Sequence, residues 1–253
     1  MLVDIHNHIL PGLDDGPESL EEALLLAATA VANGITHVIA TPHHRNRKYD
    51  NPALAVKLAA KSLNEELLKQ SIPLHILCGQ ETYFYNEMLQ DLEGNLMTLG
   101  ESGKYLLLEL PTNYFPTFIF DILLELQFSG YIPIIVHPER CEFFKRDKQL
   151  CYEIVRRGAL LQVNASTIVG ENGLTMQRFV KQLIKHNLVH FIASDAHHYK
   201  NRPFLIKGAY KYIQKKFSSQ YVTYFMENAK HVLEGSVLQP IPPISFKKNS
   251  TKH

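Results

Sequence analysis

The sequence has few of the features that mark nucleic-acid-binding, membrane or disulfide-rich proteins. Its 26 basic and 25 acidic residues give a formal net charge of +1, too small to indicate binding to nucleic acid or an anionic membrane. No apolar run reaches the length of a membrane span, and Asp4 and His6 interrupt any secretory signal. Three cysteines without a C-x-x-C pair argue against a disulfide framework or a thiolate zinc site. We therefore expect a reduced, cytoplasmic protein.

Motifs for two common kinds of hydrolytic or phosphate-binding site are also missing. The chain has no glycine loop that cradles phosphate and no G-x-S-x-G nucleophile elbow. One cysteine motif is present, because Cys151 and Arg157 fit C-x5-R, the spacing of cysteine-dependent tyrosine phosphatases. Its intervening residues are bulky and follow a helical pattern with Cys151 on the apolar face, so we interpret Cys151 as an inert core residue.

Short apolar runs alternate with amphipathic patterns along the 253 residues, which is typical of parallel strands covered by helices. Strands are expected at residues 2–6, 36–41, 74–79, 105–110, 132–137, 160–164 and 190–194. Helices are expected at residues 20–33, 53–70, 117–129, 147–158, 174–186 and 204–216.

Seven such units predict a single-domain α/β fold, a TIM-barrel-like distorted (β/α)7 barrel over residues 1–238. A doubly wound open sheet is the alternative. A proline-rich and then basic tail, residues 239–253, is expected either to pack on the surface or to be disordered.

Metal-capable side chains stand at or just after six of the predicted strands, on the edge where parallel strands all end. His6 and His8 lie two positions apart on the first strand and therefore face the same way. The other candidates are Asp14 or Asp15, His43, Glu81, Glu109, His137, Asp195 and His197. Imidazole and carboxylate ligands without thiolate suit Mn²⁺, Zn²⁺ or Fe, and nine ligands can hold two or three ions. Clustered ions of this kind hydrolyse phosphate esters, so the sequence predicts metal-assisted hydrolysis.

These residues lie in motifs that resemble the PHP (polymerase-and-histidinol-phosphatase) superfamily: D-I-H-N-H, D-D-G, T-P-H, H-P-E-R and A-S-D-A-H. The chain is most similar to its bacterial manganese-dependent protein tyrosine phosphatases, which regulate capsule and exopolysaccharide synthesis. The resemblance implies a PHP-type barrel, a trinuclear metal centre and phosphotyrosine on a partner tyrosine kinase as substrate. It implies Mn²⁺ as the ion, with Fe, Zn²⁺ and Co²⁺ as alternatives. The ligands that it implies are His6, His8, Asp15, His43, Glu81, Glu109, His137, Asp195 and His197.

The resemblance also assigns phosphate binding to Arg140, whose planar donor fork matches phosphate oxygens. The expected mechanism is attack by a metal-activated hydroxide without a covalent phosphoenzyme. Arg202 is a second candidate for phosphate binding, and His197 is a candidate to protonate the leaving phenolate unless metal binding occupies it. Arg140 can alternatively be only an ion-pair partner of Glu139 or Glu142.

Neighbouring residues receive structural interpretations. Asn164 and Ser166 are expected only to satisfy backbone groups, and Tyr83 and Tyr85 to pack rather than line a phosphotyrosine groove. Two other functions compete with the protein phosphatase: a small-molecule phosphoesterase such as a histidinol-phosphate phosphatase, and a metal-binding scaffold without activity.

Overall fold

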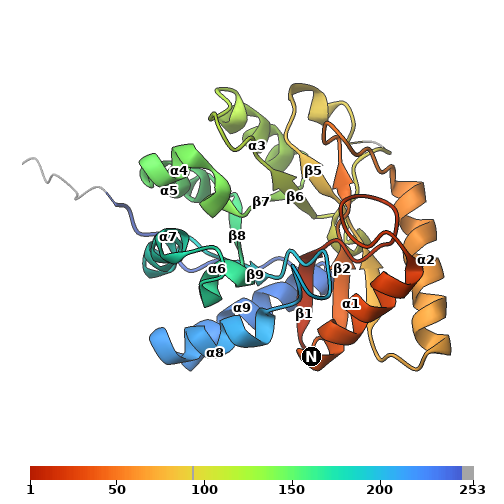
Figure 1. The fold of residues 1–253 in the computed structure, drawn as a ribbon. Coiled ribbons are helices and arrows are strands. Elements are labelled where there is room, and N and C mark those ends of the chain that lie inside the picture. The colour runs from red at the N-terminus through yellow and green to blue at the C-terminus, as the bar shows by residue number, and fades with distance from the viewer. Residues whose placement is uncertain (93, 247–253) are drawn as a thin grey trace, which may run out of the picture.

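The computed structural model describes residues 1–92 and 94–246, which form parallel strands with helices packed around them (Figure 1). The strands are β1 (Val3–Asn7), β2 (His37–Ala40), β3 (His43–His44), β4 (His75–Cys78), β5 (Glu81–Tyr83), β6 (Tyr105–Glu109), β7 (Ile132–Val136), β8 (Leu160–Asn164) and β9 (Phe191–Ala193). Every strand pair is parallel, in the ladders β1-β2-β4 and β3-β5-β6-β7-β8-β9. This confirms the predicted α/β fold with parallel strands.

All seven predicted strands are present, and two short strands lie just beyond the predicted ends of the second and third. β2 ends before Thr41-Pro42 and the chain continues as β3, while β4 ends before Gly79 and continues as β5. Pro42 has no N–H to donate to a ladder. A Cβ at Gly79 would lie 2.9 Å from the Leu99 side chain and 3.0 Å from that of Ile39, so a larger residue would require these side chains to move. The prediction ended the two strands at Thr41 and Gly79, as observed to within one residue, and missed the short strands β3 and β5 that follow.

The last strand lies against the first. The backbone N–H of Asp195 donates to the carbonyl oxygen of His6, and that of His8 donates to the carbonyl oxygen of Ala196, both at 2.8 Å. These bonds join the carboxyl ends of β1 and β9, as the predicted distorted barrel requires. Counting β2–β3 and β4–β5 as interrupted strands, seven strand positions carry the candidate site.

Side chains alternate between two buried clusters along the strands, as the period of two in a strand demands. On β6, Leu106 and Leu108 pack in the large cluster that includes the surrounding helices. Tyr105 and Leu107 pack in a smaller cluster with Ile5 and Val136. Both faces of these strands are therefore buried, which explains why they appear in the sequence as continuous apolar runs.

The helices are α1 (Leu20–Ala32), α2 (Ala53–Lys69), α3 (Ile119–Phe128), α4 (Glu142–Arg146), α5 (Gln149–Arg156), α6 (Ala165–Val169), α7 (Leu174–Lys185), α8 (Ile206–Lys216) and α9 (Ser219–Glu234). All six predicted helices are present, and Ser19 caps α1 by accepting a hydrogen bond from Glu22 N at 3.3 Å. α4, α6 and α9 were not predicted. α4 and α6 have five residues each, too few to show a helical period, whereas α9 buries Phe225, Ala229 and Val232 at helical spacing.

Among the described helices, none is both long and apolar enough to cross a bilayer. The described part of the tail, residues 239–246, lies along the end of α7. Ile244 N donates to the carbonyl oxygen of His186 at 2.8 Å, and the Phe246 ring stacks on the His186 ring with centroids 3.8 Å apart. This part of the tail packs on the surface, and the basic residues 247–253 lie outside the described residues. The boundary at residue 238 stays a prediction.

Candidate metal centre

All nine predicted ligands converge in one cluster, either at or after the carboxyl ends of β1, β6, β7 and β9 or at the starts of the short strands β3 and β5. Each has an imidazole nitrogen or a carboxylate oxygen within 3.8 Å of such an atom of another member of the set. His6 and His8 face the same way, as their spacing on β1 predicts, and their Nε2 atoms lie 3.4 Å apart. Residues at opposite ends of the chain thus form one polar cluster inside an otherwise apolar fold.

Glu81, at the start of β5, lies at the centre of this cluster and is only 1% exposed. Its Oε2 lies 2.9 Å from His43 Nδ1, 3.3 Å from His8 Nε2 and 3.4 Å from His6 Nε2. Its Oε1 lies 2.9 Å from His137 Nε2. A carboxylate that faces four imidazoles with its two oxygens has the position of a bridging ligand between ions.

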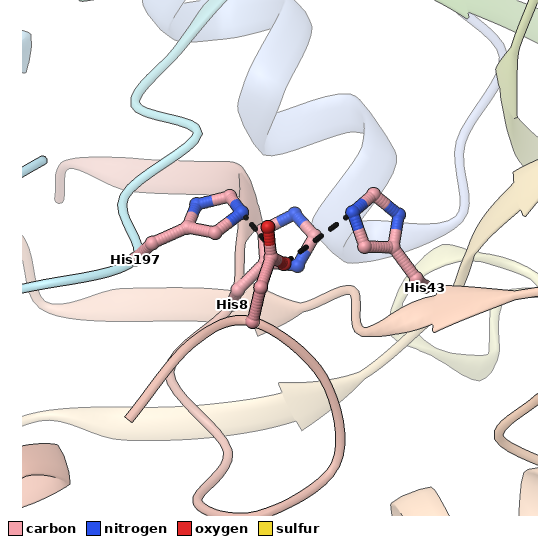
Figure 2. A group of neighbouring side chains, drawn as sticks. His8, His43 and His197 are labelled. Atoms are coloured by element: carbon pink, nitrogen blue, oxygen red, sulfur yellow. Dashed lines mark ion pairs between the residues drawn. The ribbon is translucent and has the colours of Figure 1, made fainter. Parts of the chain in front are cut away.

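A second group forms around Asp15. Its Oδ1 lies 3.2 Å from His197 Nε2 and 3.5 Å from His43 Nε2. Figure 2 shows the rings of His8, His43 and His197 turned toward one another here, and these three with Asp15 form one of three groups able to hold an ion. The other two groups are His6, His8 and Glu81, and His43, Glu81 and Glu109.

The structure separates the two adjacent aspartates that sequence geometry left open. Asp14 Oδ2 lies 2.6 Å from His8 Nδ1, on the side of that ring away from the cluster, and accepts a hydrogen bond from His43 N at 3.0 Å. Asp14 therefore orients a ligand, and Asp15 is the one that faces the cluster. Gly16 makes this loop possible, because a Cβ there would lie 2.1 Å from the carbonyl oxygen of His8.

Backbone strain marks two of the candidate ligands. His137 has a φ of 31° and Asp195 a φ of 53°, both in the left-handed region that side chains other than glycine rarely adopt. The turn at His137 ends β7 and opens the 3₁₀ turn Pro138–Arg140, which carries Arg140. Such conformations cost about 1–3 kcal/mol each and persist where the surroundings impose them, typically at functional sites.

Three ligand rings have one nitrogen tied outward, which fixes the other toward the cluster. His6 Nδ1 lies 2.9 Å from Gln162 Oε1, His8 Nδ1 lies beside Asp14, and His197 Nδ1 lies 2.9 Å from the carbonyl oxygen of Asp195. Because a carbonyl or carboxylate can only accept, each Nδ1 carries the proton and each Nε2 presents its lone pair inward. This is the arrangement of metal-binding histidines.

Strand β8 contributes an amide relay to the centre. Gln162 Nε2 donates to Asn164 Oδ1 at 2.9 Å, and Asn164 Nδ2 donates to Asp195 Oδ2 at 2.7 Å. Gln162 therefore connects His6 to Asp195. Sequence reasoning missed Gln162 and was wrong to limit Asn164 to backbone groups, because two buried amides on a strand suggest no particular partner.

We expect Gln162→Leu to lower metal affinity on the order of 10–100-fold, the usual cost of removing a group that orients a metal ligand. The substitution keeps volume but removes the acceptor of the His6 proton and the donor to Asn164. Metal titration of the chelator-stripped protein measures the change. Gln177→Leu is the matched control, since Gln177 is also buried and bonds the carbonyl oxygen of Ile168 in α6. Equal metal affinity in both variants would show that the relay does not orient His6.

The polar atoms of the cluster are better suited to binding a cation than to bonding one another. His43 Nδ1, Glu81 Oε2, Glu109 Oε2 and His137 Nδ1 are buried atoms that form no well-aligned hydrogen bond among the described residues, although the first two lie 2.9 Å apart. Burial and the neighbouring Glu81 carboxylate raise the pKa of Glu109 to about 7, so this pair repels when both are ionised. Shared coordination of a divalent ion removes that repulsion, and the nitrogen and oxygen donors suit manganese, iron or zinc.

Two arginines border the cluster at Asp195. Nη2 of Arg140 contacts Asp195 Oδ2, and Nη2 of Arg202 lies 3.0 Å from the same oxygen. Pairing of Arg140 with Glu142 was a wrong alternative, because Glu142 pairs with Lys145 at 2.6 Å. A cavity of about 360 Å³ opens beside them, and Arg140, Asp195, Lys200 and Arg202 contribute to its wall. Both predicted phosphate-binding residues thus face one cavity at the edge of the cluster.

The C-x5-R motif is confirmed as structural. Cys151 is fully buried on α5, and burial raises its pKa well above the ordinary value. Arg157 lies over the Phe120 ring, 4.1 Å from its centroid, rather than beside the thiol. Neither residue is in position for thiolate attack on a phosphate.

The aromatic residues after Glu81 differ from each other. Tyr85 is structural as predicted, because its hydroxyl donates to Asp91 Oδ2 at 2.6 Å. Tyr83 is half-buried and lines a second hollow, and the expectation that it packs rather than binding phosphotyrosine stays a prediction.

Comparison with known proteins agrees with this geometry. Residues 2–234 match the family model for capsular polysaccharide synthesis, CpsB/CapC. The chain belongs to the CpsB/CapC family. The tyrosine-protein phosphatase YwqE of Bacillus subtilis is 39% identical over 250 residues, covering 98% of each chain. The tyrosine-protein phosphatase CpsB of Streptococcus agalactiae is 30% identical over 239 residues, covering 92% of this chain and 98% of the relative.

A solved structure from this CpsB/CapC family has the same fold. It belongs to a study of crystal structures of YwqE from Bacillus subtilis and CpsB from Streptococcus pneumoniae, described there as unique metal-dependent tyrosine phosphatases. It superposes with a TM-score of 0.94 at 39% identity, over 98% of this chain and 100% of that one. The family implied by the motifs at the strand ends is therefore confirmed.

Proposed function

We propose that this chain is a metal-dependent protein tyrosine phosphatase that acts in capsular or exopolysaccharide synthesis. The observation that carries the proposal is the convergence of Arg140 and Arg202 on Asp195, at the edge of a cluster of nine metal-capable side chains. This joins a phosphate-binding element to a multi-metal centre. The relatives named as tyrosine phosphatases, and the metal dependence described for the solved structure, support the same activity.

The nine clustered residues would hold two or three ions, for which we propose Mn²⁺, the ion that the family resemblance implies; imidazoles and carboxylates without thiolate are compatible with it. Such ions neutralise charge on the phosphate and lower the pKa of a bound water toward neutrality. Glu81, which faces four of the imidazoles, would help to hold the ions, and Asp14 and Gln162 orient the imidazoles. The protein supplies a buried, preorganised set of donors in which each orienting contact is already formed.

The arginines would hold the non-bridging oxygens of the phosphate. Arg140 has a side chain 35% exposed and Arg202 one 40% exposed, so both reach the cavity while their Nη2 atoms remain on Asp195. A planar guanidinium can bond two phosphate oxygens at once, which the single ammonium of lysine cannot do. Arg140 thus fixes the orientation of the scissile bond relative to the centre.

We assign His197 to metal binding and not to proton donation. Burial and the neighbouring His8 lower the pKa of His197 to about 4, so the ring is neutral at pH 7. Its one proton lies on Nδ1 and is donated to the carbonyl oxygen of Asp195. A phenolate leaving group, with a pKa of about 10, departs without strong acid assistance.

A partner tyrosine kinase is the substrate that we propose, and the cytoplasm is the compartment. The three cysteines, Cys78, Cys141 and Cys151, are free and buried, as is typical of a reducing environment. A histidinol-phosphate phosphatase is the disfavoured alternative, because the relatives carry the name tyrosine-protein phosphatase.

The test is phosphate release from a phosphotyrosine peptide and from histidinol phosphate, each with Mn²⁺ and then with excess chelator. The proposal requires metal-dependent turnover that prefers the peptide. Preference for histidinol phosphate would instead assign the same centre to small-molecule metabolism. Absence of turnover of both by the metal-loaded protein would overturn the substrate class.

A further inference from the structure

A second hollow of about 320 Å³ lies beside β5, apart from the cavity that Arg140 and Arg202 face. It is lined by the loop after β3, by β5 and by the segment after β6. The residues used below are Arg47, Lys48, Tyr83, Thr112, Asn113 and Tyr114. We call this hollow the Arg47 cleft.

The Arg47 cleft adjoins the metal centre. Tyr83 follows Glu81 by two positions on β5, so both side chains lie on one face, about 7 Å apart along the strand. Tyr83 is also in register with Glu109 on β6. On the other side, the Tyr49 ring stacks over the His43 ring, with centroids 6.0 Å apart and an angle of 8° between the planes. Because Tyr83 of the cleft is only two residues from Glu81 of the metal centre, a substrate group bound at the centre lies next to the cleft.

The lining of the cleft is positively charged, and these charges are not paired with carboxylates in the described part of the chain. Arg47 and Lys48 are exposed, and neither forms an ion pair within the described part of the chain. Arg45, nearby in the same loop, is bound instead to Asp91 at 2.8 Å, which anchors the loop. The lining contains no aspartate or glutamate among the described residues, and Thr112 and Asn113 add further hydrogen-bonding groups.

From this geometry we infer that the Arg47 cleft binds an anionic group next to the phosphotyrosine of a protein substrate. The inference rests on the proposed function and extends it to the flanking sequence. Arg47 and Lys48 supply the charge, while Tyr83 and the exposed Tyr114 provide ring surfaces for the adjoining side chain. The anionic group is a carboxylate or a second phosphoryl group, since both offer oxygens to the same two cations.

This subsite is distinct from the phosphate site. Arg140 and Arg202 are held on Asp195 by ion pairs, and their proposed role is to bind the phosphate that is hydrolysed. Arg47 and Lys48 touch none of the nine clustered residues through an ion pair. Their role is therefore specificity, expressed in KM for flanked peptides.

The experiment compares the Arg47→Ala/Lys48→Ala variant with the wild type on four substrates, each assayed with Mn²⁺. These are a phosphotyrosine peptide flanked by glutamates, one flanked by a second phosphotyrosine, one flanked by neutral residues, and an aryl phosphate. The measured quantity is kcat/KM for each peptide relative to that for the aryl phosphate. Two exposed charge contacts predict about a fivefold loss on anionic peptides, carried by KM, and little loss on the neutral peptide. The loss should disappear in 1 M salt, where the screening length falls to about 3 Å.

Lys215→Ala/Lys216→Ala is the matched control, because it also removes two exposed positive charges, at the end of α8. A loss confined to the Arg47→Ala/Lys48→Ala variant supports the inference, and the peptide that loses more identifies the source of the anion. Equal loss in both variants, or none on anionic peptides, overturns it while leaving the phosphatase activity intact. Failure of the wild type to hydrolyse every phosphotyrosine peptide would overturn the proposed function itself.

Discussion

Glu81→Gln is expected to remove bound metal and to lower phosphoester turnover by a factor on the order of 1,000. The substitution preserves shape but replaces the carboxylate whose oxygens lie 2.9–3.4 Å from four imidazoles. An amide cannot bridge two cations, and the loss of Lewis-acid stabilisation worth several kcal/mol corresponds to about three powers of ten in rate. Metal content by elemental analysis, measured together with steady-state turnover, tests the prediction.

Glu142→Gln provides the control for Glu81→Gln. Glu142 lies close to the H-P-E-R turn, but among the residues that the structure describes its side chain pairs with Lys145 alone and is 49% exposed. Its variant should retain wild-type metal content and turnover. If Glu81→Gln also kept its full metal content, the central position of that carboxylate would not reflect metal binding.

Arg140→Ala should lower turnover by about 100- to 1,000-fold while the metal content stays unchanged, which is the usual effect of removing one donor to a developing oxyanion. Asp195 keeps two partners in this variant, because Arg202 lies 3.0 Å and Asn164 Nδ2 lies 2.7 Å from its Oδ2. The ligand therefore stays in position, and the loss falls on phosphate binding. Turnover and metal content measured on the same preparation check the result.

Two further variants sharpen the test of Arg140. Arg140→Lys should recover only part of the activity, because a lysine returns the charge without the planar fork. Arg178→Ala, which removes an exposed arginine of α7, should have no effect. Loss of metal in Arg140→Ala would show instead that Arg140 serves mainly to hold Asp195.

Much of the fold was predictable because its signals are local. Parallel strands buried on both faces read as apolar runs, and the capping box at Ser19 marked the start of α1. The short strands β3 and β5 and the five-residue helices α4 and α6 were missed. A strand of two or three residues and a helix of one turn are shorter than the periods that reveal them.

The candidate site was predictable in membership but not in arrangement. His6 and His8 follow from a period of two, and strand ends in a parallel fold share one edge. The contact of Arg140 with Asp195, and the relay through Gln162 and Asn164, join residues far apart in the chain. No local pattern encodes such pairs, since they depend on strand register.

The sequence by itself determined which side chains stand at the strand ends, and hence the kind of donor atoms available for metal. That information is local, because strand periodicity decides which side chains share a face and each β/α unit returns the chain to the same edge. Residue spacing left Asp14 and Asp15 open, and the tertiary structure shows that Asp15 faces the cluster while Asp14 holds His8, and that Glu81 occupies the centre. The physical reason is that the joining of β9 to β1 and the tight approach of the loop at Gly16 fix distances between atoms that no spacing along the chain specifies.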